Sequence, residues 1–161
     1  MQTREKLIKK LISTLLIIFV IPLAASAQQL LGTYKLVSFN SIFDDGTSYS
    51  FVGPNPIGYA IITPKRFMTI LTSTDRQPGK TIDEKAALFN SLIAYSGPYT
   101  VEGSKLVTAV DVSWNQSWTG TKQGRTWTVE GNQLILVTDK APSVKDPSKL
   151  AVGRLVWEKI E

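Results

Sequence analysis

GYAIITPKRFMTILT, residues 58–72, consists of two short apolar runs separated by Pro64 and Lys65. Both runs are rich in β-branched and aromatic residues, and neither is long enough for a typical helix. Two such runs divided by turn residues predict a pair of antiparallel strands. We therefore expect a β-hairpin with strands over 58–63 and 66–72, and a chain of the antiparallel β class.

The same pattern recurs on both sides of this hairpin. Short runs bounded by Gly, Asp, Asn or Pro predict further strands over residues 32–40, 48–52, 99–102, 105–114, 124–129, 133–138 and 152–159. Evenly spaced short strands predict an all-β domain with one short α-helix, closed as an antiparallel β-barrel of about eight or nine strands. A barrel of that size has an interior wide enough for side chains or one small ligand.

The helix is expected over residues 83–95. Its apolar residues recur at a helical spacing, as with Leu88, Phe89 and Leu92. Thr81 and Glu84 have the spacing of a capping box at a helix N-terminus. Because the apolar stripe has no other surface to pack on, we expect the helix to cover one end of the barrel.

Residues 1–27 have the three parts of a cleavable signal peptide. Four basic residues precede an apolar run over 11–23, and Ala25-Ser26-Ala27 supplies the small residues that signal peptidase recognises. The run is short for a membrane span, which needs about 20 apolar residues. We expect cleavage after Ala27, export to the periplasm or outside the cell, and no membrane span in the remaining domain, residues 28–161.

Composition excludes several function classes. The chain has 18 basic and 13 acidic residues, and removing residues 1–27 leaves 14 and 12, a net charge of +2. These basic residues are scattered, which argues against a nucleic-acid partner. The chain contains no His and no Cys. The usual zinc, copper and haem ligands and any Ser-His-Asp or Cys-His catalytic group are therefore absent, and we expect no metal and no cofactor.

Seven short segments occur in an order that resembles the bacterial and fungal lipocalin-like domain family. Together they span almost all of the chain after the leader. They are Gly32–Ser38, Gly53–Tyr59, Ile61–Pro64, Tyr95–Gly103, Val112–Asn115, Trp118–Gln123 and Leu155–Lys159. The resemblance implies a lipocalin-like β-barrel with a central cavity and, by analogy, a small apolar ligand.

Tyr34 and Arg154 are the residues that the resemblance assigns to barrel closure. Tyr34 follows Gly32 with one residue between them, where lipocalins usually carry a Trp at the barrel floor. In that fold an Arg from the last strand packs over the aromatic ring, and Arg154 is the matching residue. The stacking would be a cation–π contact worth about 0.5–2 kcal/mol.

Arg125 is the charged candidate for ligand binding. The period of two places it on the same strand face as Gln123 and Trp127, which is expected to face inward. In one interpretation its guanidinium holds a ligand carboxylate or enolate. In the other, Arg125 lies at the rim and pairs with Asp111 or Glu102.

Aromatic residues supply the other candidates for ligand binding. Trp114 and Trp118 flank a polar turn, and in one interpretation they line a cavity mouth. In the other, Trp114 belongs to the core. Tyr95 and Tyr99 bracket Gly97-Pro98, which places them near one opening. The full set of expected ligand-binding residues is Arg125, Trp127, Trp114, Trp118, Tyr59, Phe67, Tyr95 and Tyr99.

Three functions fit these observations. The first is an exported, lipocalin-like protein that binds a small apolar or amphipathic molecule in the barrel. The second is a cofactor-independent isomerase or cyclase that uses the same cavity and needs a buried carboxylate of raised pKa. Asp111 is the one acid deep in a predicted strand, and its alternation with Val110 and Val112 points it outward. The third is a filled barrel that acts as an interaction module of the cell envelope.

Overall fold

A computed structural model describes residues 28–143 and 146–161. The predicted signal peptide, residues 1–27, lies outside the described residues. The elements are β1 (Gly32–Phe43), β2 (Ser48–Ser50), β3 (Ile57–Ile62), β4 (Phe67–Thr72), α3 (Ile82–Asn90), β5 (Leu92–Gly97), β6 (Tyr99–Glu102), β7 (Lys105–Ala109), β8 (Val112–Ser113), η1 (Gln116–Trp118), β9 (Lys122–Glu130), β10 (Gln133–Thr138), β11 (Ala141–Pro142) and β12 (Leu150–Lys159).

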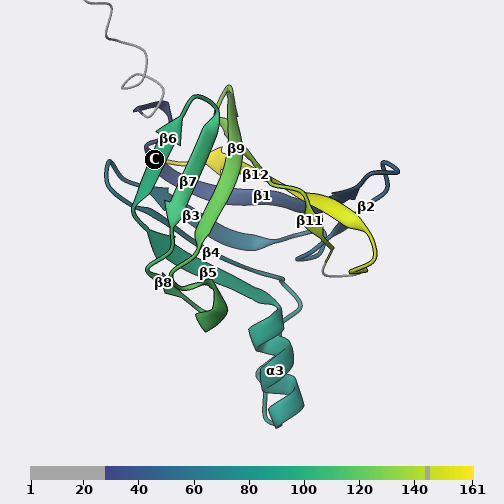
Figure 1. Cartoon of the computed structure of the whole chain (residues 1–161). Helices are drawn as coiled ribbons and strands as arrows, with labels where there is room; N and C mark the ends of the chain where they lie inside the picture. The colour runs from purple at the N-terminus through teal and green to yellow at the C-terminus, as the bar shows by residue number, and fades with distance from the viewer. Residues whose placement is uncertain (1–27, 144–145) are drawn as a thin grey trace, which may run out of the picture.

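The strands form one curled antiparallel sheet. Ten strands follow the path β6-β7-β9-β10-β12-β1-β3-β4-β5-β8, and the short strands β2 and β11 pair with β1 and β12. Figure 1 shows β6, β7 and β9 crossing in front of β1, β3, β4 and β5. The sheet therefore curls into a half-barrel with a concave inner face. The expected closed barrel of eight or nine strands is therefore wrong, because the path has two ends, at β6 and β8.

The corner at Pro98 explains these ends. Pro98 has no N–H and cannot donate a ladder hydrogen bond, so the chain bends there. β5 then pairs with β8, while β6 pairs with β7. Two backbone bonds cross the corner: Ala109 N donates to the Pro98 carbonyl at 2.9 Å, and Asp111 N donates to the Ser96 carbonyl at 3.1 Å. Gly97 permits this approach, since a Cβ there would lie 1.9 Å from the Ala109 carbonyl oxygen.

The expected hairpin over residues 58–72 is confirmed. β3 and β4 pair in antiparallel register, with Tyr59 opposite Ile70 and Ile62 opposite Phe67. Side chains alternate between the two faces, so Ile62 and Phe67 are buried on the concave side and Ile70 is exposed on the convex side. This pair forms the part of the half-barrel on which Phe67 enters the interior.

Helix α3 starts as expected but ends earlier. The Thr81 side chain accepts a hydrogen bond from Glu84 N, and the Glu84 carboxylate accepts from Thr81 N, which completes the capping box. The helix ends at Asn90, and the residues expected to continue it to Tyr95 form β5. None of its residues is buried. Figure 1 shows the helix extending away from the sheet, so it does not cover an end of the half-barrel.

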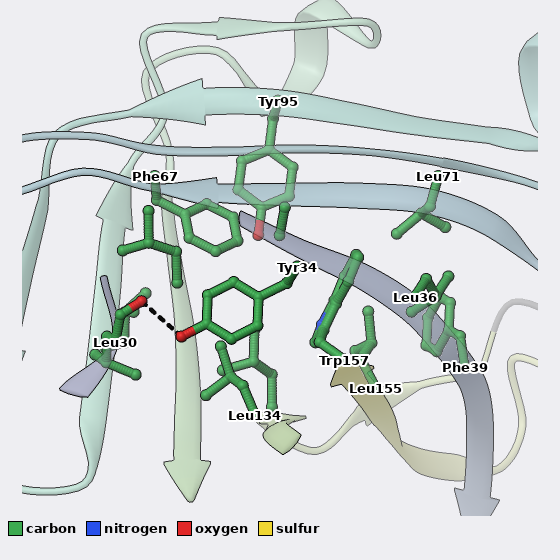
Figure 2. Close-up of a cluster of buried hydrophobic side chains, with 14 of the residues drawn as sticks. Leu30, Tyr34, Leu36, Phe39, Phe67, Leu71, Tyr95, Leu134, Leu155 and Trp157 are labelled. Atoms are coloured by element: carbon green, nitrogen blue, oxygen red, sulfur yellow. Dashed lines mark hydrogen bonds between the residues drawn. The ribbon is translucent and has the colours of Figure 1, made fainter. Parts of the chain in front are cut away.

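The core lies on the concave side of the sheet. Its largest fully buried side chains are those of Trp157, Tyr34 and Phe67. Figure 2 shows Tyr34 and Trp157 side by side beneath Phe67 and Tyr95, with the Tyr34 hydroxyl bonded to the Leu30 carbonyl. Burying each aromatic ring stabilises the fold by about 2–3 kcal/mol relative to an exposed ring. This cluster fills one part of the interior, and the rest is hollow.

In residues 28–143 and 146–161, no helix has both the length and the apolar character that crossing a membrane requires.

Candidate functional site

A cavity of about 580 Å³ occupies the concave side of the half-barrel next to the packed core. Its volume lies in the range of about 300–1,000 Å³ that is typical of small-molecule sites. Strands from both layers of the curled sheet contribute to its wall. The aromatic residues of the wall are Phe39, Phe51, Phe67, Phe89, Tyr95, Trp114, Trp118 and Trp157.

Five of these rings form a continuous row along one wall. Starting at α3, the centroid distances are 6.3 Å from Phe89 to Trp114, 4.9 Å from Trp114 to Trp118, 5.6 Å from Trp118 to Tyr95, and 5.6 Å from Tyr95 to Phe67. Tilted and edge-to-face contacts at these distances are favourable. The row therefore gives the cavity a continuous apolar wall that runs from the last turn of the helix into the core.

The loop that carries Trp114 and Trp118 is held by local hydrogen bonds. The Asn115 side-chain oxygen accepts from Ser117 N at 3.1 Å and from the Ser117 hydroxyl at 2.8 Å, which starts the short helix η1. The Trp114 indole N–H donates to the Phe89 carbonyl at 3.2 Å. The predicted polar turn, residues 115–117, thus orients Trp114 and Trp118 at the cavity.

Arg125 lies in the cavity wall on β9, a strand that is paired on both sides. Its neighbours across the ladder are Leu106 on β7 and Thr138 on β10. Its Nη1 donates to the Gly124 carbonyl at 2.7 Å. Within the part of the chain that the structure describes, no carboxylate lies within ion-pair distance of its guanidinium.

The two acids considered as partners for Arg125 lie elsewhere. Asp111 forms an ion pair with Arg66 at 2.8 Å, and both side chains are nearly half exposed. Glu102 is exposed at the end of β6, opposite Lys105 in the hairpin. The structure therefore does not support the pairing of Arg125 with either acid, and it leaves a cation in the cavity wall.

Tyr95 is the polar neighbour of Arg125. Its ring points from β5 into the interior, as Figure 2 shows, and only 7% of the residue is exposed. Burial raises the pKa of the Tyr95 hydroxyl, while the nearby Arg125 lowers that pKa through its positive charge and a hydrogen bond. The hydroxyl stays protonated at neutral pH and can donate a hydrogen bond.

Two other charged residues reach the cavity wall, Lys122 and Asp139. Asp139 forms an ion pair with Lys105, so its negative charge is compensated. Lys122 is exposed at the start of β9. The charges in the wall that are not paired within the described residues are therefore positive.

Five of the eight residues expected to bind a ligand line this cavity. They are Arg125, Trp114, Trp118, Phe67 and Tyr95.

The other three lie away from the cavity. Tyr59 faces outward and is 44% exposed. Tyr99 packs against the core beyond the Pro98 corner, and its hydroxyl donates to the Thr63 carbonyl at 3.0 Å. Trp127 is half-buried against the core opposite Leu136 and is not part of the wall.

The expected stacking of Arg154 over Tyr34 is wrong. In the β1–β12 ladder Tyr34 lies opposite Lys159, whereas Arg154 lies opposite Asn40. Tyr34 and Asn40 are six residues apart on β1, which corresponds to roughly 20 Å along a strand. Arg154 also alternates with Gly153 and Leu155, which line the cavity, so it points to the other face. Trp157, from the same strand, is the residue that packs beside Tyr34 (Figure 2).

Sequence reasoning missed four aromatic residues of the wall, which are Phe39, Phe51, Phe89 and Trp157. Trp157 follows Leu155 at the period of two on β12, and this alternation is a signal that could have identified it. Phe39 gives no such signal, because a register shift in β1 between Leu36 and Ser38 changes which side chains face inward.

Residues 28–143 and 146–161 contain no group of three or more His, Cys, Asp or Glu side chains that could hold a metal ion.

Comparisons with known proteins give one family. The model of a lipocalin-like domain family matches residues 31–160. No curated protein matches the sequence. Three solved chains match, and one is a lipocalin-like protein from Bacteroides uniformis, with 14% sequence identity and a TM-score of 0.45 over 81% of this chain and 98% of that chain.

Proposed function

We propose that this chain, which belongs to the lipocalin-like domain family, binds one small apolar or amphipathic molecule in the cavity of its half-barrel. The observation that carries the proposal is the cavity of about 580 Å³ with its wall of eight aromatic residues. Binding sites for small molecules are concave and mostly apolar, with a few polar groups that orient the ligand. Arg125 and Tyr95 are such polar groups in this wall.

Binding is favoured over catalysis by the position of the acids. An isomerase or cyclase that acts without a cofactor needs an acid or base in the cavity. Asp111 lies outside the cavity with Arg66, and the pKa of Asp111 is lowered by the hydrogen bonds from Arg66. Asp139 reaches the wall but is paired with Lys105. Asp111 is therefore held outside the cavity with a lowered pKa, and the carboxylate of Asp139 is already held by a lysine.

A pair of bulky substitutions on β4 tests the proposal. Thr69 lines the cavity, and its neighbour Ile70 is half exposed on the other face. Thr69→Trp should fill the cavity, while Ile70→Trp adds the same bulk outside it. The probe is the neutral dye N-phenyl-1-naphthylamine, whose fluorescence rises when it enters an apolar site.

We expect the wild type and the Ile70→Trp variant to bind the dye alike. The Thr69→Trp variant should bind it at least about tenfold more weakly, since the space for the dye is lost. Circular dichroism of each variant reports whether the fold is retained. Absence of dye binding by the wild type, or equal binding by both variants, would contradict the proposal.

We also propose that the domain acts after export. The support is the order of basic, apolar and small residues in positions 1–27. The experiment is N-terminal sequencing of the protein from the extracytoplasmic fraction of an expressing cell. A chain that starts at Gln28 is the expected result, and an intact Met1 on the purified protein would contradict it.

A further inference from the structure

The half-barrel cavity combines an apolar wall with a cation that has no carboxylate partner among the described residues. Arg125 projects from the middle of the sheet, since β9 is paired with β7 and with β10 at this position. A guanidinium has five N–H donors, and the Gly124 carbonyl is the acceptor found for one of its nitrogens. Arg125 is partly buried, and partial removal of a charge from water without an ionic partner costs free energy. A ligand that supplies an anion therefore gains affinity here.

Tyr95 adds a second donor beside Arg125. The two residues come from opposite parts of the curled sheet, β5 and β9, and both line the cavity. Tyr95 lies between two rings of the aromatic row, with centroid distances of 5.6 Å to Phe67 and 5.6 Å to Trp118. A charged group bound by Arg125 and Tyr95 therefore has apolar surface directly next to it.

The remaining charges of the cavity wall also favour a negatively charged ligand. Lys122 adds a second positive charge, and the negative charge of Asp139 is paired with Lys105. The geometry suits a planar carboxylate, because a single guanidinium can bind both of its oxygens with two parallel hydrogen bonds.

We infer that the ligand is a carboxylate-bearing amphiphile, whose carboxylate is bound by Arg125 and Tyr95 and whose apolar part lies along the aromatic row. This inference rests on the proposed function, because it assigns a chemical class to the ligand of the same cavity. It also gives the polar end of the ligand a fixed position in the half-barrel.

The experiment compares two molecules that differ in the head group alone, decanoate and decanol, at neutral pH. Each is titrated as a competitor of N-phenyl-1-naphthylamine against the wild type. A charged hydrogen-bond pair contributes about 10- to 100-fold in affinity. We therefore expect decanoate to displace the dye at concentrations at least about tenfold lower than decanol.

Three variants locate the preference. Arg125→Met removes the charge while keeping an unbranched side chain of similar length, and it should make decanoate no better than decanol while dye binding is retained. Tyr95→Phe should reduce the preference in part. Arg154→Met makes the same replacement on the outer face of β12, and it should leave the preference unchanged.

The outcomes separate this inference from the proposed function. If the wild type binds the dye and decanol but does not prefer decanoate, the carboxylate inference fails and the cavity proposal stands. A preference that survives in Arg125→Met, or that is lost equally in Arg154→Met, also overturns the inference. If the wild type binds neither the dye nor either competitor, both fail.

Discussion

Arg66 and Asp111, which are 45 residues apart in the chain, form an ion pair with two hydrogen bonds. Arg66 Nη1 donates to Asp111 Oδ1 at 2.9 Å, and Arg66 Nη2 donates to Asp111 Oδ2 at 2.8 Å. Arg66 Nη1 also donates to the buried Ser96 hydroxyl at 3.1 Å. The pair joins the turn before β4 to the segment between β7 and β8, on the outside of the half-barrel. It therefore holds Asp111 away from the cavity and from Arg125.

The first prediction concerns the stability that this ion pair contributes as a function of pH. Hydrogen bonds from Arg66 lower the pKa of Asp111 in the folded protein below its value of about 3.9 in an unfolded chain. A lowered folded-state pKa means that the contribution is complete above the unfolded-state pKa and is lost as the pH falls through the folded-state pKa. Asp111→Asn should lower the Tm at pH 7, and the difference from the wild type should shrink below about pH 4.

Glu102→Gln provides the control for this pH series, because Glu102 is an exposed acid without an ion pair among the described residues. Its Tm should follow that of the wild type at every pH. Added salt should reduce the effect of Asp111→Asn, because both partners are nearly half exposed. A Tm difference for Asp111→Asn that is the same at pH 7 and pH 3 would contradict the prediction.

Local signals predicted the hairpins and the helix start well. The alternation over residues 58–72 and the Thr81–Glu84 capping box both operate within a few residues, and both appear in the structure. The helix end was misplaced because Leu92 and Ile93 satisfy a helical spacing and a strand alike. Leu92 pairs with Thr72 and Ile93 pairs with Leu71 on β4, and this pairing makes the segment a strand. Because the paired residues are far apart in the sequence, no local pattern indicates it.

The same limit applies to the cavity. Arg125 was found from alternation along a regular strand, and it lines the wall. Phe39 was missed because alternation from Tyr34 places Ser38 inward, until the register shift in β1 reverses the order. The loss of the expected Tyr34–Arg154 contact has a similar cause, since the register of β1 against β12 is set by packing along the whole ladder and not by either residue.

The second prediction concerns the floor of the core at Tyr34. Its hydroxyl donates to the Leu30 carbonyl at 2.9 Å, and both residues are almost fully buried. Tyr34→Phe keeps the ring and leaves that carbonyl without this donor. We expect a loss of about 1–2 kcal/mol in the free energy of unfolding, measured by urea denaturation. An unchanged midpoint would mean that the bond contributes nothing to stability.

The third prediction compares two buried threonines. The Thr108 hydroxyl is fully buried and has no hydrogen-bond partner within the described ranges. The Thr69 hydroxyl donates to the Tyr59 carbonyl at 3.2 Å. Thr108→Val should leave stability unchanged or raise it by up to about 1 kcal/mol, and Thr69→Val should lower it by about 1 kcal/mol. Equal losses in both variants, measured by thermal denaturation, would contradict this assignment.

The fourth prediction concerns the corner between β5 and β6. A Cβ at Gly97 would lie 1.9 Å from the carbonyl oxygen of Ala109 and 2.7 Å from its carbonyl carbon. These are backbone atoms that take part in the corner, so they cannot move aside as a flexible side chain would. Gly97→Ala should therefore force the two strands apart and cost about 2–3 kcal/mol in the free energy of unfolding. Thr100→Ala, an exposed change just beyond the corner, should stay within about 0.5 kcal/mol of the wild type. If the two variants have the same urea midpoint, the close approach of β5 to β7 is not what holds this corner.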